Sequence, residues 1–165
     1  IIEGSHQHKR LVQICGADLI STTFFRGELT LEVSKDAVLG ICDAVKSDES
    51  LKMIFLSDIV GVDFYPATPR FALVYHLYSI PMKIRLRIKV RLEEGETVDS
   101  VTPLWNSANC AEREVYDMFG VTFDNHPNLT RVYLPDDWEG HPLRKDYPLR
   151  GYKDEYNPFG EEKKD

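Results

Sequence analysis

The sequence predicts an α+β fold, a mixed β-sheet packed by helices, followed by a long proline-rich extended C-terminal segment. Residues 84–92, IRLRIKVRL, alternate strictly between apolar and basic side chains, as a strand with one buried face does. Apolar residues recur at helical spacing over 38–45. Prolines then interrupt regular structure at positions 127, 135, 142, 148 and 158. We therefore divide the chain into a body at 1–120 and a C-terminal segment at 121–165.

The first half of the body shows the patterns of a helix, a hairpin and a second helix. Residues 10–20 place apolar side chains on one helical face. Residues 22–33 alternate around Gly27, which is typical of two strands joined by a turn. Ser34 is the expected N-cap of the second helix. The apolar stripe of that helix consists of Val38, Ile41, Cys42 and Val45.

The second half of the body predicts three strands and two helices. Residues 53–66 and 70–80 are rich in β-branched and aromatic side chains, which favour strands. Because 70–80 is apolar on both faces, we expect it to be central in the sheet, next to the strand at 84–92. A helix is expected at 98–105, and another begins near Asn109.

The last predicted helix carries its own end signals. Asn109 and Glu112 resemble a capping box. Arg113 and Asp117 are spaced to form an i, i+4 ion pair on the polar face. Gly120 suits the left-handed residue that follows a helix, so the helix is expected to end there.

Composition and motifs exclude several function classes. The net charge of -7 over 165 residues argues against a nucleic-acid partner, which requires a basic footprint. The sequence has no P-loop, no G-x-G-x-x-G and no G-x-S-x-G motif, so nucleotide binding and serine hydrolysis have no support. No apolar run approaches the roughly 18 residues of a membrane span. Membrane association is therefore expected only through partners.

The cysteines do not predict a cofactor in this chain. Cys15, Cys42 and Cys110 are widely spaced and form no C-x-x-C pair. An iron–sulfur cubane normally needs four thiolates, and an odd count argues against a disulfide framework. The three side chains are expected to be small buried hydrophobic groups in a reducing compartment.

Histidines and aspartates of the C-terminal segment are candidate metal ligands. The candidates are His126, Asp136, Asp137, His141 and Asp146. No helical ligand pair or other spacing recipe fixes their geometry. We therefore favour the interpretation that these side chains hydrogen-bond to backbone or pair with arginines. His76 lies in a predicted strand and is expected to be structural.

The basic row of residues 85–91 has two open interpretations. Arg85, Arg87, Lys89 and Arg91 share one face of the strand. They form either a docking face for an acidic partner or phosphate, or a solvated face balanced by acids on a neighbouring strand. The C-terminal segment is different, because it holds Trp138, Tyr133 and Tyr147 among many prolines. Such a segment is too apolar for a solvated tail, so we expect interface anchors there.

Residues 110–149, CAEREVYDMFGVTFDNHPNLTRVYLPDDWEGHPLRKDYPL, resemble the signature of one protein family. This family is the 30 kDa subunit of respiratory complex I, the proton-pumping NADH:quinone oxidoreductase. The resemblance extends over about 50–150, while 1–48 fit only loosely. Asp124-Asn125 departs from the family, which usually has a glycine in that turn.

The resemblance implies a cofactor-free hydrophilic subunit of the peripheral arm, on the cytoplasmic face of the inner membrane. Its expected partners are the large 49 kDa-type quinone-site subunit and the subunit with the terminal iron–sulfur cluster. FMN, iron–sulfur clusters and quinone belong to the complex, and no catalytic or metal residue is implied here. The expected interface residues, with their charges paired across the subunit boundary, are Glu112, Arg113, Asp117, Phe119, His126, Arg131, Asp136, Asp137, Trp138, His141, Leu143, Arg144, Lys145, Asp146 and Tyr147.

Two alternatives remain open at the level of sequence. A homologous module serves membrane-bound hydrogenases and quinone- or ferredoxin-linked oxidoreductases. A different class of protein would be a stand-alone metal-dependent hydrolase that uses the histidines and aspartates of 126–146. Metal analysis of the purified chain separates these classes, and proteins that co-purify from the native membrane identify the complex.

Overall fold

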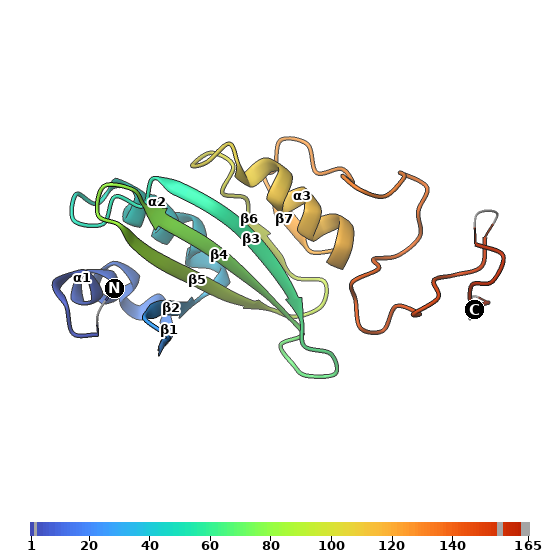
Figure 1. Ribbon diagram of the computed structural model, residues 1–165, viewed down its shortest axis with the longest axis horizontal. Coiled ribbons are helices and arrows are strands. Elements are labelled where there is room, and N and C mark those ends of the chain that lie inside the picture. Colours follow the sequence, from blue (N-terminus) through green and yellow to red (C-terminus); the bar gives the residue numbers. More distant parts are fainter. Residues whose placement is uncertain (2, 155–156, 163–165) are drawn as a thin grey trace.

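A computed structural model describes residues 1, 3–154 and 157–162, which form an α+β fold with a mixed sheet, as predicted (Figure 1). The elements, in order, are α1 (His6–Cys15), β1 (Leu19–Phe25), β2 (Glu28–Val33), α2 (Val38–Ser47), β3 (Phe55–Asp63), β4 (Phe71–Ser79), β5 (Ile84–Leu92), β6 (Thr97–Asp99), α3 (Ala108–Phe119) and β7 (Thr122–Asp124). Short 3-10 turns at Gly16–Asp18 and Lys35–Ala37 precede β1 and α2. Among the described residues, none of the helices combines the length and the apolar composition that a membrane span requires.

The main sheet of the described chain has the order β1-β2-β5-β4-β3. Its pairs are antiparallel except β2–β5, which is parallel. Leu86, Ile88 and Val90 of β5 are buried against the same core as residues of all three α-helices. The helices therefore cover one face of the sheet, while the basic side chains of β5 lie on its second face.

Several predicted elements are confirmed. The hairpin at 22–33 is β1 and β2, and the alternation at 84–92 gives β5 with the same bounds. The strands predicted at 53–66 and 70–80 are β3 and β4, and β4 lies between β5 and β3, as expected. Strands β2 and β5 each keep one buried face along their whole length, so side-chain alternation was enough to locate them, while β3 and β4 were located by their β-branched and aromatic composition.

Two predicted helices are wrong in part or in whole. The helix expected at 10–20 is α1 (His6–Cys15), which begins four residues and ends five residues earlier than predicted, because Gly16 follows it as the C-cap with a φ of 52°. The helix expected at 98–105 does not form, because Thr97–Asp99 pairs in parallel with β7 (Thr122–Asp124). Strand β7 lies beyond the body predicted at 1–120, so the regular structure continues past that division.

Two predicted helix caps are also corrected. Ser34 precedes the 3-10 turn at Lys35–Ala37, and its side chain makes no capping hydrogen bond. Helix α3 begins at Ala108 after Ser107, so Asn109 lies inside the helix. The Glu112 carboxylate binds Ser100 instead of the helix start.

Candidate docking interface

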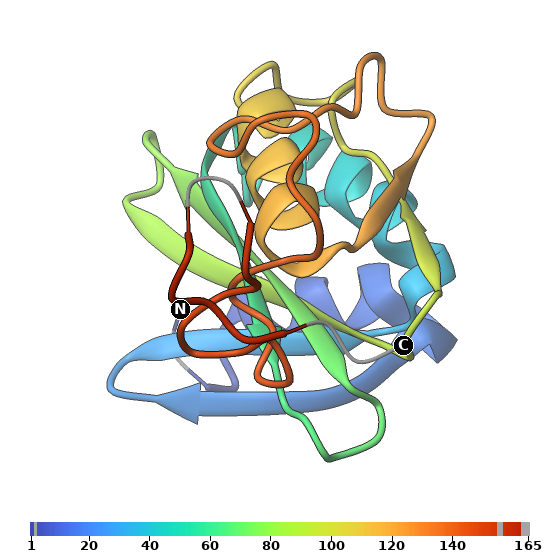
Figure 2. The ribbon, with the colours of Figure 1, turned by 90° about the vertical axis from the view of Figure 1, so that its right-hand side faces the viewer.

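The C-terminal segment leaves β7 and passes along α3 (Figure 2). Among its described residues, 125–154 and 157–162 contain no helix and no strand beyond an isolated bridge between Tyr152 and Glu161. The prolines explain this, because each removes a backbone donor and fixes its own φ. Side-chain and backbone hydrogen bonds to α3 and to the loops of the body hold this irregular path in place.

Asp117 of α3 is the main anchor of the segment's first turn. Its side chain is fully buried, and its Oδ2 accepts hydrogen bonds from the backbone N–H groups of Val132, Tyr133 and Leu134 at 2.8–3.1 Å. Arg131 donates to Oδ1 at 2.7 Å. Burial acts to raise the pKa of Asp117, but these donors outweigh it and hold the pKa below its ordinary value. Asp117 therefore stays ionised and fixes residues 131–134.

Arg113 and Arg131 use their remaining donors on backbone carbonyls. Arg113 donates to the carbonyls of Thr130 and Arg131 at 3.0 and 2.9 Å. Arg131 donates to the carbonyls of Trp138 and Gly140 at 2.8 and 3.1 Å. The predicted ion pair between Arg113 and Asp117 is therefore wrong, because a turn that sequence spacing does not show supplies both residues with closer partners.

The segment also satisfies the last carbonyls of α3. His141 Nδ1 lies 2.9 Å from the carbonyl oxygen of Asp117. The backbone N–H of Leu143 donates to the carbonyl oxygen of Met118 at 3.1 Å, and Arg144 Nε donates to the carbonyl oxygen of Phe119 at 2.6 Å. A helix end leaves such carbonyls without intrahelical partners, so the segment acts as the C-terminal cap of α3.

Five ionised side chains then fasten the segment to two loops of the body. We name this set the Arg70 cluster; it consists of Asp63, Arg70, Glu94, Arg144 and Asp146. Arg70 Nη2 lies 2.9 Å from Asp63 Oδ2 and 2.6 Å from Asp146 Oδ1. Glu94 bridges Arg70 and Arg144 at 2.9 and 2.8 Å. Burial acts to raise the pKa of Asp63, but hydrogen bonds from Arg70 and two backbone N–H groups lower it to about 2.

Glu112 and His126, two of the residues that we predict at a partner interface, lie in the interior of the isolated chain. Both side chains are fully buried. Glu112 accepts from Ser100 Oγ at 2.6 Å and from the Val101 N–H at 2.8 Å, and burial raises its pKa to about 7. His126 Nδ1 accepts from the Asn128 N–H at 3.0 Å, so its Nε2 carries the proton, 3.9 Å from Glu112. Neither side chain is exposed to solvent in the described chain, and their contact with a partner stays a prediction.

Other charges of the segment also find partners inside the chain. Asp117 pairs with Arg131, Asp146 with Arg70 and Arg144 with Glu94, while pairing of these residues across a subunit boundary stays a prediction. The sequence could not show these internal pairs, because Arg70 and Asp146 are 76 positions apart. His126 and His141 bond to backbone atoms and Asp146 to an arginine, as our preferred interpretation of the possible metal ligands states. No group of three metal-ligating side chains lies together in the described part of the chain.

Other predicted interface residues remain accessible. Asp136, Asp137 and Lys145 are exposed, while Trp138 and Tyr147 are half-buried. Phe119 is half-buried and packs against Gly61 of β3, where an added Cβ would lie 2.7 Å from its ring.

Apolar side chains of the segment are exposed beside them. Leu149 is 100% exposed, Tyr133 66% and Leu143 55%. With Val132 they form what we call the apolar set. Such side chains on an otherwise well-bonded segment are typical of a surface that another protein covers.

The basic row on the second face of the sheet is largely balanced within the chain. Lys89 lies 2.8 Å from Glu32, and Arg87 lies 3.3 Å from Glu28, both acids of the neighbouring strand β2. The interpretation as a balanced, solvated face is therefore confirmed for these two residues. Arg85 differs, because no acid of the described residues lies within 4.0 Å of it.

The sequence model of the family described as "Respiratory-chain NADH dehydrogenase, 30 Kd subunit" matches residues 31–153. The chain belongs to this family. The C-type subunit of the NADH-quinone oxidoreductase of Citrifermentans bemidjiense is 52% identical over 81% of this chain and 82% of that protein. A C-type subunit of the same enzyme in Rhizobium meliloti is 51% identical over 82% and 75%.

A solved structure outside these relatives shares the fold. It is a chain of the membrane-bound sulfane sulfur reductase, described as an archaeal respiratory membrane complex. The TM-score is 0.76 at 23% identity, over 90% of this chain and 87% of that chain. At this identity the likeness concerns the fold alone.

The family resemblance stated from residues 110–149 is thus confirmed, but sequence reasoning missed the residues that hold the segment. Asp63, Arg70 and Glu94 were not singled out. Arg70 pairs with Asp63 and Asp146, and Glu94 pairs with Arg144. The only local signal was an acid at the end of a strand and an arginine at the start of the next one.

Proposed function

We propose that the chain is a cofactor-free structural and assembly subunit in the hydrophilic peripheral arm of a proton-translocating NADH:quinone oxidoreductase. It packs beside the 49 kDa-type quinone-site subunit and the subunit that carries the terminal iron–sulfur cluster. It reaches the cytoplasmic face of the inner membrane through these partners. Relatives named as C-type subunits of NADH-quinone oxidoreductase, at about half identity, support this role.

The apolar set is the observation that carries the proposal. The C-terminal segment uses its polar groups to bind the body, yet it holds Tyr133, Leu143 and Leu149 largely in solvent. Full burial of one leucine stabilises an interface by roughly 1.5–3 kcal/mol. A segment fixed before binding also loses little conformational entropy on docking. The fixed segment is therefore suited to present apolar anchors to a partner subunit.

The test is isolation of the tagged chain with its complex from native membranes. Leu149→Asp should lower recovery of the partner subunits, because it places a charge in a dry contact. The melting temperature of the isolated variant should stay unchanged, since Leu149 is fully exposed. Ile20→Asp is the matched control, at an exposed position on β1, which lies at the other end of the molecule (Figure 1). Normal recovery of Leu149→Asp would count against the proposal.

The shared fold with a sulfane sulfur reductase chain supports a second candidate, a homologous module of another membrane-bound respiratory complex. Such complexes include membrane-bound hydrogenases and ferredoxin-linked oxidoreductases. The same isolation separates the two candidates, because only the first should bring down a flavoprotein that oxidises NADH. The metal-dependent hydrolase is the weakest alternative, since His126, His141 and Asp146 already have other hydrogen-bond partners.

A further inference from the structure

On the second face of the main sheet, the half around Lys89 and Arg91 has cationic side chains that already contact partners within the chain. There Lys89 Nζ lies 2.8 Å from Glu32 Oε2, and the Arg91 guanidinium lies over the Phe64 ring with 4.1 Å between its carbon and the ring centroid. Ala72, in the next strand beside Arg91, is fully buried although it points to this face. This half therefore offers a partner only paired or stacked cations.

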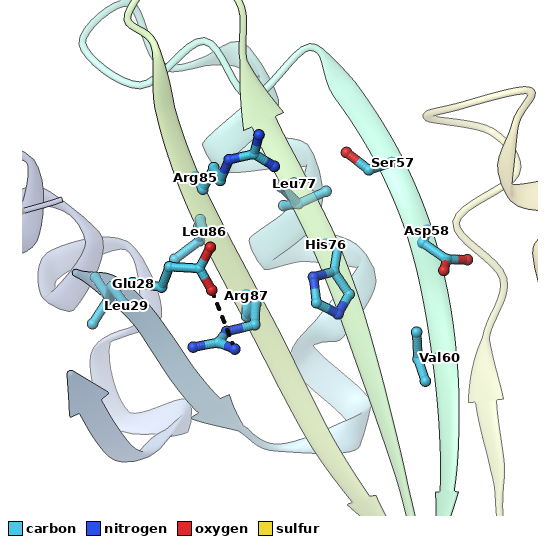
Figure 3. A pocket seen from close by; sticks show the side chains of 10 residues that line it. All are labelled: Glu28, Leu29, Ser57, Asp58, Val60, His76, Leu77, Arg85, Leu86 and Arg87. Carbon is cyan, nitrogen blue, oxygen red and sulfur yellow. Dashed lines mark ion pairs between the residues drawn. The ribbon is translucent and has the colours of Figure 1, made fainter. Parts of the chain in front are cut away.

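The other half of the same face is hollowed (Figure 3). The hollow has a volume of about 360 Å³, and its polar lining consists of Glu28, Ser57, Asp58, His76, Arg85 and Arg87. Register explains the gathering, because β-sheet pairing places Asp58, His76 and Arg87 in one row across β3, β4 and β5. We name it the open-face hollow.

Its cations are incompletely satisfied. Arg85 has no acid of the described chain within 4.0 Å, and its guanidinium lies 5.1 Å from the centroid of the Tyr78 ring. Arg87 reaches Glu28 at 3.3 Å through Nη1, but its Nε is buried and has no hydrogen-bond partner in the described structure. A buried donor of this kind destabilises the protein unless an acceptor is supplied.

The acids and the histidine of the hollow do not complete this balance. Asp58 Oδ1 accepts from the N–H of Ile59 at 2.8 Å, and Figure 3 shows its carboxylate turned away from the two arginines. Burial and the nearby Arg87 lower the pKa of His76, so the imidazole is neutral and adds no charge at pH 7. The formal charges of the lining cancel, but the two acids leave the guanidinium of Arg85 and the buried Nε of Arg87 without an acceptor in the described structure.

We propose that the open-face hollow receives the carboxylate of an aspartate or glutamate from a neighbouring subunit. The carboxylate accepts from the guanidinium groups of Arg85 and Arg87, and the exposed Val60 contacts the apolar part of the same segment. This surface is separate from the C-terminal segment, and it rests on the proposed role as a subunit.

The chemistry favours a protein carboxylate over a phosphate ligand. A volume of about 360 Å³ is at the low end for small-molecule sites. The floor is a sheet face, without the helix N-terminus or glycine-rich loop that commonly binds phosphate. On an acidic chain, a local pair of arginines also fixes the orientation of an acidic partner, because like charges elsewhere oppose other placements.

A photo-crosslinking amino acid at Ser57 tests the occupant directly. Ser57 is exposed at the irregularity in β3, so the replacement leaves the core untouched. After irradiation in native membranes and isolation of the complex, we expect a crosslinked peptide from another subunit with an acidic residue beside the attachment point. A peptide without an acid, a lipid, or a second copy of this chain as the product overturns the proposal.

The same probe at Leu149 keeps this test apart from the proposed function. Crosslinks from Leu149 without any from Ser57 refute the hollow and leave the subunit role standing. Absence of both refutes the subunit role itself.

Charge reversal supplies an independent measurement. Arg85→Glu should lower recovery of the chain in the isolated complex roughly tenfold or more, because it places two carboxylates together. Arg85→Lys should retain part of the recovery, since it keeps the charge but not the two-pronged geometry. The control is Arg26→Glu, the same charge change at an exposed turn. If Arg85→Glu and Arg26→Glu assemble equally well while the melting temperatures are unchanged, the hollow binds no carboxylate.

Discussion

Removal of the Asp117 carboxylate should release the first turn of the C-terminal segment from α3. In Asp117→Ala, the three backbone N–H groups of residues 132–134 and the Arg131 guanidinium lose one shared acceptor. Each hydrogen bond to a charged group contributes about 1.5–3 kcal/mol, but the contributions are not additive, because water reaches the donors once the turn loosens. The cost of breaking one buried pair, about 3–5 kcal/mol, is the better guide, since the Arg131 side chain is only 13% exposed.

Two measurements resolve where this loss appears. If the turn and the body unfold together, about 3–5 kcal/mol lowers the melting temperature by roughly 10 °C for a chain of this size. If the turn opens first, amide hydrogen exchange accelerates at residues 131–134 while the body stays protected. The control is Asp43→Ala, at an exposed position on α2. An unchanged melting temperature together with unchanged exchange at 131–134 would refute the anchoring role of Asp117.

Three further predictions concern single side chains. The folded-state pKa of Glu112, about 7, exceeds its ordinary 4.5, so the stability present at acidic pH is lost as pH rises from 4.5 to 7, by roughly 3 kcal/mol. Glu112→Gln should remove this slope in urea titrations, and equal slopes would contradict the burial argument. Asp146→Asn should speed proteolysis at 144–150 but change stability by less than about 1 kcal/mol, since this carboxylate is partly exposed; cleavage no faster than in Asp136→Asn would count against the Arg70 cluster as a fastener. Gly120→Ala should lower the unfolding free energy more than Gly95→Ala does, because both glycines have positive φ but only at Gly120 would the Cβ meet His141, at 2.6 Å; equal losses in chemical denaturation would show that this contact relaxes freely.

The sequence predicted those elements that depend on neighbouring residues, and it did not predict those that depend on residues far apart in the chain. The bounds of β5 followed from alternation within nine residues, because apolar and polar side chains alternate along a strand that has one buried face. The strand at Thr97–Asp99 lies where the sequence predicts the start of a helix, since its partner at Thr122–Asp124 lies on the far side of α3. A strand of three residues shows too little periodicity to be distinguished from the first turn of a helix.

In the candidate interface, too, local sequence features were predicted and contacts between distant residues were not. The residues that resemble the family were found, and Trp138, Leu143 and Tyr147 remain candidates for contact with a partner. Charge alone, however, did not show where Arg144 and Asp146 would find their partners, because ion pairing depends on the folded path of the chain. Surface charges of an irregular segment are as well suited to fasten it to its own body as to another protein.

The parallel pairing of β2 with β5 has a consequence for synthesis of the chain. Lys89 of β5 pairs with Glu32 of β2, 57 positions earlier. At a synthesis rate of roughly 5–20 residues per second, β5 is completed roughly 3–11 seconds after the hairpin of β1 and β2. During this time the apolar side chains Leu29 and Leu31 and the free edge of β2 have no native strand to meet. Strands β3, β4 and β5 pair in succession as they emerge, so we expect the hairpin to join last, and ribosome-associated chaperones to bind the nascent chain in that interval.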